Sequence, residues 1–223
     1  MGPSIEWYLA FGVKNRNSRT MVPKNLNHVF RIFEKNFKPI PLEAVFNSPF
    51  QTLVAVMLSA RTRDETTAKI CQNLFKIAPT VQKLNHLNIE ELTELLRSVG
   101  FYKTKAKHLK NLTASLLHNF KGEVPQILES LTSLPGVGRK TANIVLGRAF
   151  NIPAIGVDTH VHRIVNALGW VKTKTPEQTE RELVRVLPKK YWIKINQYFV
   201  SIGQQYRSNK QLTNFLKLHN IIL

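Results

Sequence analysis

Cysteine is almost absent from this 223-residue sequence, which contains only Cys71. A single thiol excludes an internal disulfide, and it excludes any metal site or iron–sulfur cluster that needs three or four cysteines of this chain. The sequence also lacks an apolar run of about 18 residues, the length that a membrane-spanning helix needs. These absences predict a protein of a reducing compartment with no segment that spans a membrane.

Acidic side chains are scarce as well, because 14 Asp and Glu stand against 32 Lys and Arg and leave a formal net charge of +18. The excess is uneven, since residues 101–223 carry 19 basic and 6 acidic side chains. Such a surplus predicts a polyanionic partner, either nucleic acid or an anionic membrane surface. The membrane is the weaker of the two, because the basic residues are not confined to one amphipathic helix. Plain solubility is the third interpretation.

Residues 1–24 are predicted to be a polar tail, for which disorder is one expectation, and they lack the apolar core of a secretory signal. From Asn25 onward, apolar residues recur at helical spacing, and no Asn-Gly or Asp-Gly turn joins alternating segments. We therefore expect an all-α fold of about ten short helices. The first helix would bury one face made of Leu26, Val29, Phe30, Phe33 and Phe37.

Capping residues and glycines predict where the helices begin and end. Ser48 before Pro49 opens an apolar helix that reaches about Ala60, and Asp64 is expected to cap the helix that follows. Asn88 and Glu91 form a capping box. The further helices are expected over 89–98, 102–120, 125–134, from Pro176 onward and, as the final one, over 191–206.

The most informative segment runs from Leu134 to Ala142 and reads LPGVGRKTA, between helical patterns over 127–134 and 139–150. Gly136 and Gly138 allow a sharp turn and close approach of another backbone, and Val137 would anchor the turn in the core. Because the turn opens a helix, its unpaired N–H groups favour a phosphate. A P-loop and a dinucleotide fingerprint both lack required residues here. A helix–turn–helix corner without a ligand is the alternative.

Lys140 and Asp158 are the candidate catalytic residues. Lys140 lies in the first turn after the hairpin, where the helix dipole and Arg139 favour the neutral amine, the form that makes Schiff bases. A phosphate contact is the commoner role for such a lysine. Asp158 is expected to cap the next helix, and a carboxylate held there can face a developing cation. A metal site at His160 and His162 is not expected, because side chains two residues apart on a helix point to different faces.

The hairpin segment is followed, eighteen residues after the lysine, by Asp158 within Val-Asp-Thr-His. Together these blocks resemble the helix-hairpin-helix glycosylase superfamily and, within it, the endonuclease III family, from about Leu26 to about Tyr206. The resemblance also covers Ser48-Pro49-Phe50, Leu58-Ser59-Ala60, Gly100 to Ala106, and Gly122 to Pro125. It implies two helical subdomains with a DNA-binding cleft between them. One would comprise 25–44 and 152–223, and the other, a helical barrel, 45–151 with the helix-hairpin-helix motif at about 127–150.

The activity that this resemblance implies is that of a bifunctional DNA glycosylase and abasic-site lyase of base excision repair. Such an enzyme removes oxidised pyrimidines from duplex DNA through a lysine Schiff base and nicks the strand by β-elimination. By position, Lys140 would be the nucleophile and Asp158 the essential carboxylate. DNA contacts are implied for Gly136, Val137, Gly138, Arg139, Thr141, Arg61, Phe101 and His160.

Two of these residues would enter the base stack. Arg61 stands where the family commonly has a Gln that fills the gap left by the flipped base, and Phe101 stands where it has an apolar wedge. The Arg leaves the opposite-base preference open. Two alternative functions stay open too: a glycosylase of the same fold for mismatched thymine, uracil or a damaged purine, and a non-catalytic helix-hairpin-helix DNA-binding protein.

The chain departs from the family in its cofactor. The family usually ends in four cysteines that hold a [4Fe–4S] cluster, and residues 203–223 contain none. We therefore expect no cofactor and no iron–sulfur cluster, apart from the monovalent cation that the family sometimes binds at the hairpin. The last helix and tail would replace the cluster. The expected partner is double-stranded DNA with a damaged base or an abasic site. The protein is expected to be a monomer. In a bacterium or archaeon it would act in the cytoplasm, at the nucleoid, and in a eukaryote it would act in the nucleus or an organelle.

Overall fold

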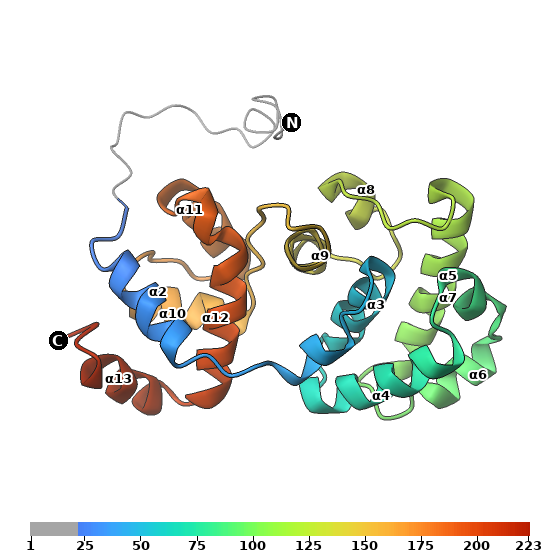
Figure 1. Cartoon of the computed structure of the whole chain (residues 1–223), viewed down its shortest axis with the longest axis horizontal. Coiled ribbons are helices and arrows are strands. Elements are labelled where there is room, and N and C mark those ends of the chain that lie inside the picture. The colour runs from blue at the N-terminus through green and yellow to red at the C-terminus, as the bar shows by residue number, and fades with distance from the viewer. Residues whose placement is uncertain (1–21) are drawn as a thin grey trace.

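The computed structural model describes residues 22–223, and this part of the chain consists of helices and connecting turns without a strand (Figure 1). The all-α fold is therefore confirmed, whereas most of the predicted tail lies outside the described residues. The helices are α2 (Leu26–Lys35), η1 (Pro41–Val45), α3 (Pro49–Ser59), α4 (Asp64–Ile77), α5 (Val81–His86), α6 (Ile89–Leu95), α7 (Tyr102–Phe120), α8 (Leu128–Thr132), α9 (Arg139–Phe150), α10 (Thr159–Ala167), α11 (Pro176–Val186), η2 (Lys189–Tyr191), α12 (Trp192–Gln205) and α13 (Asn209–Leu218), where η marks a 3₁₀ helix.

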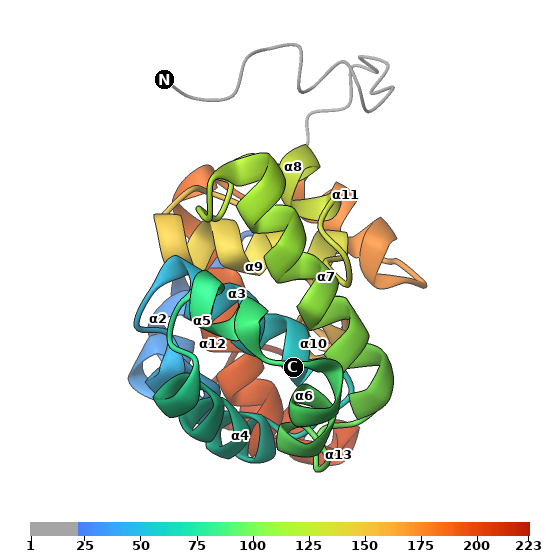
Figure 2. The same ribbon diagram turned by 90° about the vertical axis from the view of Figure 1, so that its right-hand side faces the viewer.

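Helices distant in the sequence lie side by side in two groups. Figure 1 shows α3 to α9 on one side and α2 with α10 to α13 on the other, and the chain passes between the groups after α2 and again after α9. α3 packs on α9, α2 packs on α12, and α9 with α12 joins the groups. Figure 2 shows α7 running along the outside of the first group, where it packs against α5 and α6. The exact boundaries 25–44, 45–151 and 152–223 stay a prediction.

Most of the predicted caps are present. The Ser48 hydroxyl accepts a hydrogen bond from the Gln51 N–H at 3.2 Å, and Asn88 and Glu91 form both bonds of their capping box. α11 begins in the same way, because the Thr175 side chain accepts a hydrogen bond from the Gln178 N–H and Pro176 takes the first position. Each cap satisfies an N–H that the helix itself leaves unpaired, which is why these local signals suffice to start a helix.

Predicted helix boundaries were wrong at Asp64, at both ends of the helix expected over 125–134, which is Leu128–Thr132, and at the end of the helix expected over 89–98. Asp64 is the first residue of α4 rather than its cap, because its carboxylate accepts a hydrogen bond from Gln204 Nε2 at 2.6 Å instead. α8 begins only at Leu128, because Ile127 is extended, with φ −123° and ψ 135°. α6 ends at Leu95, since a tight turn follows, in which the Val99 N–H donates to the Leu96 carbonyl at 2.7 Å.

The helix over 191–206 is not the final one, because α13 follows it. Ser208 caps α13, forms a capping box with Gln211 and provides a local signal that the sequence interpretation missed. The Tyr206 ring stacks on Phe215 with ring centroids 4.4 Å apart, and Phe215 also packs against Phe33 of α2. The C-terminal segment is thus part of the hydrophobic core rather than a loose tail.

Candidate active site

The turn between α8 and α9 has the tight geometry that was predicted from its glycines at Gly136 but not at Gly138. Gly136 has φ +78°, and a Cβ there would lie 2.9 Å from the Cβ of His108, so only glycine fits. Val137 between the glycines is buried, as predicted. Gly138 is different, because a Cβ there would meet nothing within 4 Å. It precedes α9 with no side-chain cap, and the start of this helix is therefore open to a ligand.

Lys140, the second residue of α9, is exposed and lies on the wall of a cavity. Its neighbour Arg139 points toward α11, where its Nε donates to the Glu180 carboxylate at 2.8 Å. Glu180 is buried and also accepts from Asn143 Nδ2 at 3.1 Å. This cluster ties the hairpin to α11. The predicted DNA contacts of Arg139 and of Thr141, the third residue of α9, stay predictions.

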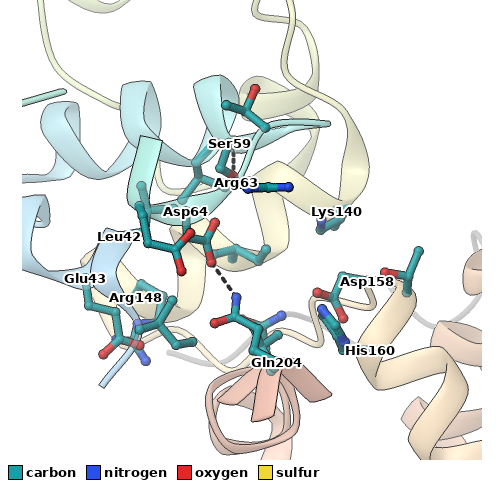
Figure 3. Close-up of a pocket in the computed structure, with 18 of the residues that line it drawn as sticks. Leu42, Glu43, Ser59, Arg63, Asp64, Lys140, Arg148, Asp158, His160 and Gln204 are labelled. Atoms are coloured by element: carbon teal, nitrogen blue, oxygen red, sulfur yellow. Dashed lines mark hydrogen bonds and ion pairs between the residues drawn. The ribbon is translucent and has the colours of Figure 1, made fainter. Parts of the chain in front are cut away.

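Asp158 ends the extended segment that leads from α9 to α10. Its Oδ1 accepts from the Val161 N–H at 2.8 Å, which confirms the predicted cap. The half-buried carboxylate is thereby held in one orientation at the cavity wall. Figure 3 shows Lys140, Asp158 and His160 next to one another on one side of this cavity.

The cavity measures about 460 Å³, within the range of sites that enclose small organic ligands. Segments from both groups of helices line it: η1, the end of α3 with the start of α4, one face of α9, the start of α10, and α12. Apolar side chains and charged ones share the wall. A flat ring with polar edges would therefore find both packing surface and hydrogen-bond partners here.

Carboxylates occupy the opposite side of the cavity, and the sequence interpretation assigned none of them to it. Asp64 is hydrogen-bonded to Gln204 across the two groups of helices, and Glu43 forms an ion pair of 2.6 Å with Arg148. Burial raises the pKa of both carboxyl groups above the ordinary range. The partners come from segments far apart in the chain, Asp64 and Gln204 being 140 residues apart. No local pattern could have brought them together.

His160 is the second residue of α10 and lies against α12. A Cβ on Gly203 would be 2.5 Å from its Nδ1, so the ring occupies the space that glycine leaves. Burial lowers the pKa of His160, although the charge of Asp158 works in the opposite direction. The structure thus places His160 in the cavity wall beside Asp158, and its predicted DNA contact stays a prediction.

Arg61 and Phe101 lie together, although 40 positions separate them in the sequence. Both have left-handed backbone conformations, with φ 55° and 60°, at the tips of neighbouring turns. The Arg61 guanidinium carbon lies 5.3 Å from the centroid of the Phe101 ring, which is largely exposed. Neither side chain lines the cavity, but Thr62, next to Arg61, does.

The residues of this chain do not fit a four-cysteine iron–sulfur cluster. Cys71 lies in the core within α4, and burial raises the pKa of its thiol to about 12, which leaves it protonated and a poor metal ligand. Within residues 22–223, no group of three His, Cys, Asp or Glu is placed to hold a metal ion. The same residues contain no helix long and apolar enough to cross a membrane. The monovalent cation at the hairpin stays a prediction.

Comparisons with known proteins agree with this geometry. A family model described as "HhH-GPD superfamily base excision DNA repair protein" matches residues 54–189. Endonuclease III of Thermotoga maritima is 43% identical over 185 residues, which are 83% of this chain and 84% of that protein. Endonuclease III of Escherichia coli is 36% identical over 181 residues, 81% of this chain and 85% of that protein.

Solved structures with the same fold include complexes with DNA. A trapped covalent intermediate of endonuclease III and DNA matches with a TM-score of 0.78 at 34% identity, covering 85% of this chain and 90% of that one. A thermostable thymine-DNA glycosylase matches with a TM-score of 0.73 at 18% identity, covering 82% and 86%, and shares the fold alone. The resemblance drawn from the hairpin is confirmed: the chain belongs to the HhH-GPD superfamily of base excision DNA repair proteins and, within it, to the endonuclease III family.

Proposed function

We propose that this protein is a bifunctional DNA glycosylase and abasic-site lyase of base excision repair that removes oxidised pyrimidines from duplex DNA. The observation that carries the proposal is the placement of Lys140 and Asp158 in one wall of one cavity, each at the start of a helix. Relatives named endonuclease III, one of them solved as a covalent intermediate with DNA, support it. A protein that only binds DNA would need the hairpin but not this pair.

The chemistry follows from the two side chains. A base inside the duplex is out of reach, so it is flipped into the cavity. Lys140 gives up a proton, and its amine attacks the sugar C1′ while the bond to the base breaks; the base leaves with the bonding electrons and takes up a proton. The sugar gains positive charge in this transition state, and the fixed Asp158 carboxylate stabilises that charge.

The lyase step uses the same lysine. The nitrogen loses a proton and O4′ gains one as the C1′–O4′ bond breaks, and this ring opening leaves an iminium ion between Lys140 and C1′, which acidifies the hydrogens on C2′. Loss of a C2′ proton drives electrons into a new C2′–C3′ double bond and expels the 3′ phosphate. Water then hydrolyses the Schiff base and releases the lysine.

The hairpin and the net positive charge of the chain serve to hold the DNA. The open start of α9 behind Gly136, Val137 and Gly138 suits a backbone phosphate, because N–H groups and the helix dipole both favour an anion there. Arg61 and Phe101 would enter the stack beside the flipped nucleotide.

We propose that the protein acts as a monomer and that its partner is double-stranded DNA. Because the relatives named above are bacterial proteins, the nucleoid of a bacterial cell is the proposed place of action.

Borohydride trapping tests the assignment. Wild type and Lys140→Gln are incubated with a duplex that carries one thymine glycol and with one that carries an abasic site, and Lys69→Gln, at an exposed position on α4, is the matched control. We expect wild type and the control to form a covalent adduct on both duplexes and Lys140→Gln on neither. An adduct with Lys140→Gln would refute the nucleophile. Wild-type trapping on the abasic duplex alone would shift the substrate to a mismatch or a damaged purine.

A further inference from the structure

Lys105 is a buried lysine that the proposed chemistry does not use. It lies on the inner face of α7, only 7% exposed, in line with the fully buried Leu109, Leu112 and Leu116. Its ammonium donates to the carbonyls of Leu58 and Ala60 at 2.8 and 2.5 Å and to the hydroxyl of Thr62 at 3.2 Å.

These three acceptors all belong to the end of α3 and the turn behind it, which carries Arg61. The last carbonyls of a helix have no partner within the helix. The three N–H groups of an ammonium match the three acceptors, and this match allows the group to be buried. Burial lowers the pKa of Lys105 to about 8, which leaves it mostly charged at neutral pH.

A further hydrogen bond joins the turn that carries Arg61 to the turn that carries Phe101. The Thr62 hydroxyl also accepts from the Gly100 N–H at 3.0 Å. A Cβ on Gly100 would lie 2.6 Å from the Arg61 carbonyl oxygen, so the two backbones touch. Arg61 and Phe101 then meet in their cation–π contact at the tips. A strained left-handed residue persists only where its surroundings hold it, and Lys105 with Thr62 supplies that support.

We propose that Lys105, acting through Thr62, is a positioning residue that locks Arg61 and Phe101 into one preformed wedge for the DNA stack. The proposal rests on the proposed function, because a wedge is needed only where a base leaves the stack. Unstacking costs free energy, and two side chains already held in place avoid an additional ordering cost on binding. Lys105 itself would touch neither DNA nor the reacting atoms.

The test separates flipping from chemistry. Each variant is measured in single turnover on two substrates: a thymine glycol in duplex DNA, which must be flipped, and an abasic site in a single-stranded oligonucleotide, which needs no wedge. The variants are Lys105→Met, Thr62→Val and Thr62→Ser. Lys110→Met is the matched control, because Lys110 lies on the same helix and also donates to backbone carbonyls, those of Asn85 and Leu87, away from the wedge.

We expect Lys105→Met to slow excision from the duplex about 30-fold and to leave single-strand cleavage within about twofold. Thr62→Val should slow excision from the duplex about 10-fold, and Thr62→Ser, which keeps the hydroxyl, should recover most of that rate. Lys110→Met should leave both rates within about twofold.

A direct signal of insertion comes from 2-aminopurine beside a tetrahydrofuran abasic analogue in a duplex. Wild type should raise its fluorescence on binding, and Lys105→Met should not do so even at saturation. Equal losses on both substrates, or the same selective loss in Lys110→Met, would overturn the proposal. Failure of the proposed function would be seen instead in wild type, as no excision of thymine glycol, and the fluorescence comparison would still test the wedge.

Discussion

Two successive helices, α9 and α10, begin in opposite ways. α9 follows Gly138 and has no side-chain cap, whereas α10 follows Asp158, whose carboxylate accepts the Val161 N–H. A helix start carries partial positive charge and unpaired donors. The start of α10 is satisfied by a side chain of the protein, whereas no side chain caps the start of α9. The capped start of α10 holds the Asp158 charge rigidly, and the uncapped start of α9 suits a phosphate beside Lys140.

The largest expected effect separates the two roles of Asp158. Asp158→Asn keeps a good cap but removes the charge, so excision should fall about 10³-fold while the free energy of unfolding changes by less than about 0.5 kcal/mol. Asp158→Ala should lose the same activity and, in addition, about 1 kcal/mol of stability. Single-turnover excision and urea unfolding measure the two quantities. Excision by Asp158→Asn near the wild-type rate would mean that the carboxylate only caps.

Gly138→Asp would make the start of α9 resemble that of α10. A new cap and a favourable charge at the helix start should raise the free energy of unfolding by about 0.5 kcal/mol. The same carboxylate would repel the phosphate, so DNA affinity should fall about tenfold and the salt dependence of binding should become weaker. Gly138→Asn, a neutral cap, is the control and should weaken binding less. If DNA affinity stays unchanged in Gly138→Asp, no phosphate binds there.

Gly136→Ala, in the turn before α9, should mainly lower the free energy of unfolding. The substitution combines a positive φ with a contact of 2.9 Å to His108, and we expect a loss of about 2 to 3 kcal/mol. Gly169→Ala is the control, because φ is +68° and nothing lies within 4 Å of the added Cβ. That control should lose only the backbone contribution, about 1 kcal/mol. Equal losses in urea unfolding would show that His108 moves away at no cost.

The smallest expected effect is on the pH dependence of the free energy of unfolding, and it comes from His160 in the first turn of α10. Its pKa is lowered in the folded state, mainly by burial, so the unfolded chain takes up this proton first as the pH falls below about 6.5. The free energy of unfolding should therefore decrease from there down to the folded pKa and then level off. His160→Gln should flatten that part of the stability curve. An unchanged curve would show that the ring protonates without cost in the folded protein.

Local signals predicted much of the fold because they act over a few residues. The caps at Ser48, Asn88 and Asp158 and the bounds 102–120 and 139–150 agree with the structure, since each depends on bonds within one helical turn. The capping box of α13 was equally local, but it lies beyond the segment that resembles the family. The predicted cap at Asp64 was wrong because its carboxylate accepts a hydrogen bond from the side-chain amide of Gln204, which is distant in the sequence, instead of from the start of the helix.

The sequence by itself determined the all-α class, the hairpin with its two glycines, and the pairing of Lys140 with Asp158 as candidate catalytic residues. Only the tertiary structure decided which groups share the cavity, that Arg61 and Phe101 meet, and that Lys105 is buried. The physical reason is the range of the interactions. Helix caps and turns are satisfied within a few residues, whereas a buried ammonium or carboxylate needs acceptors and donors that folding brings from distant parts of the chain.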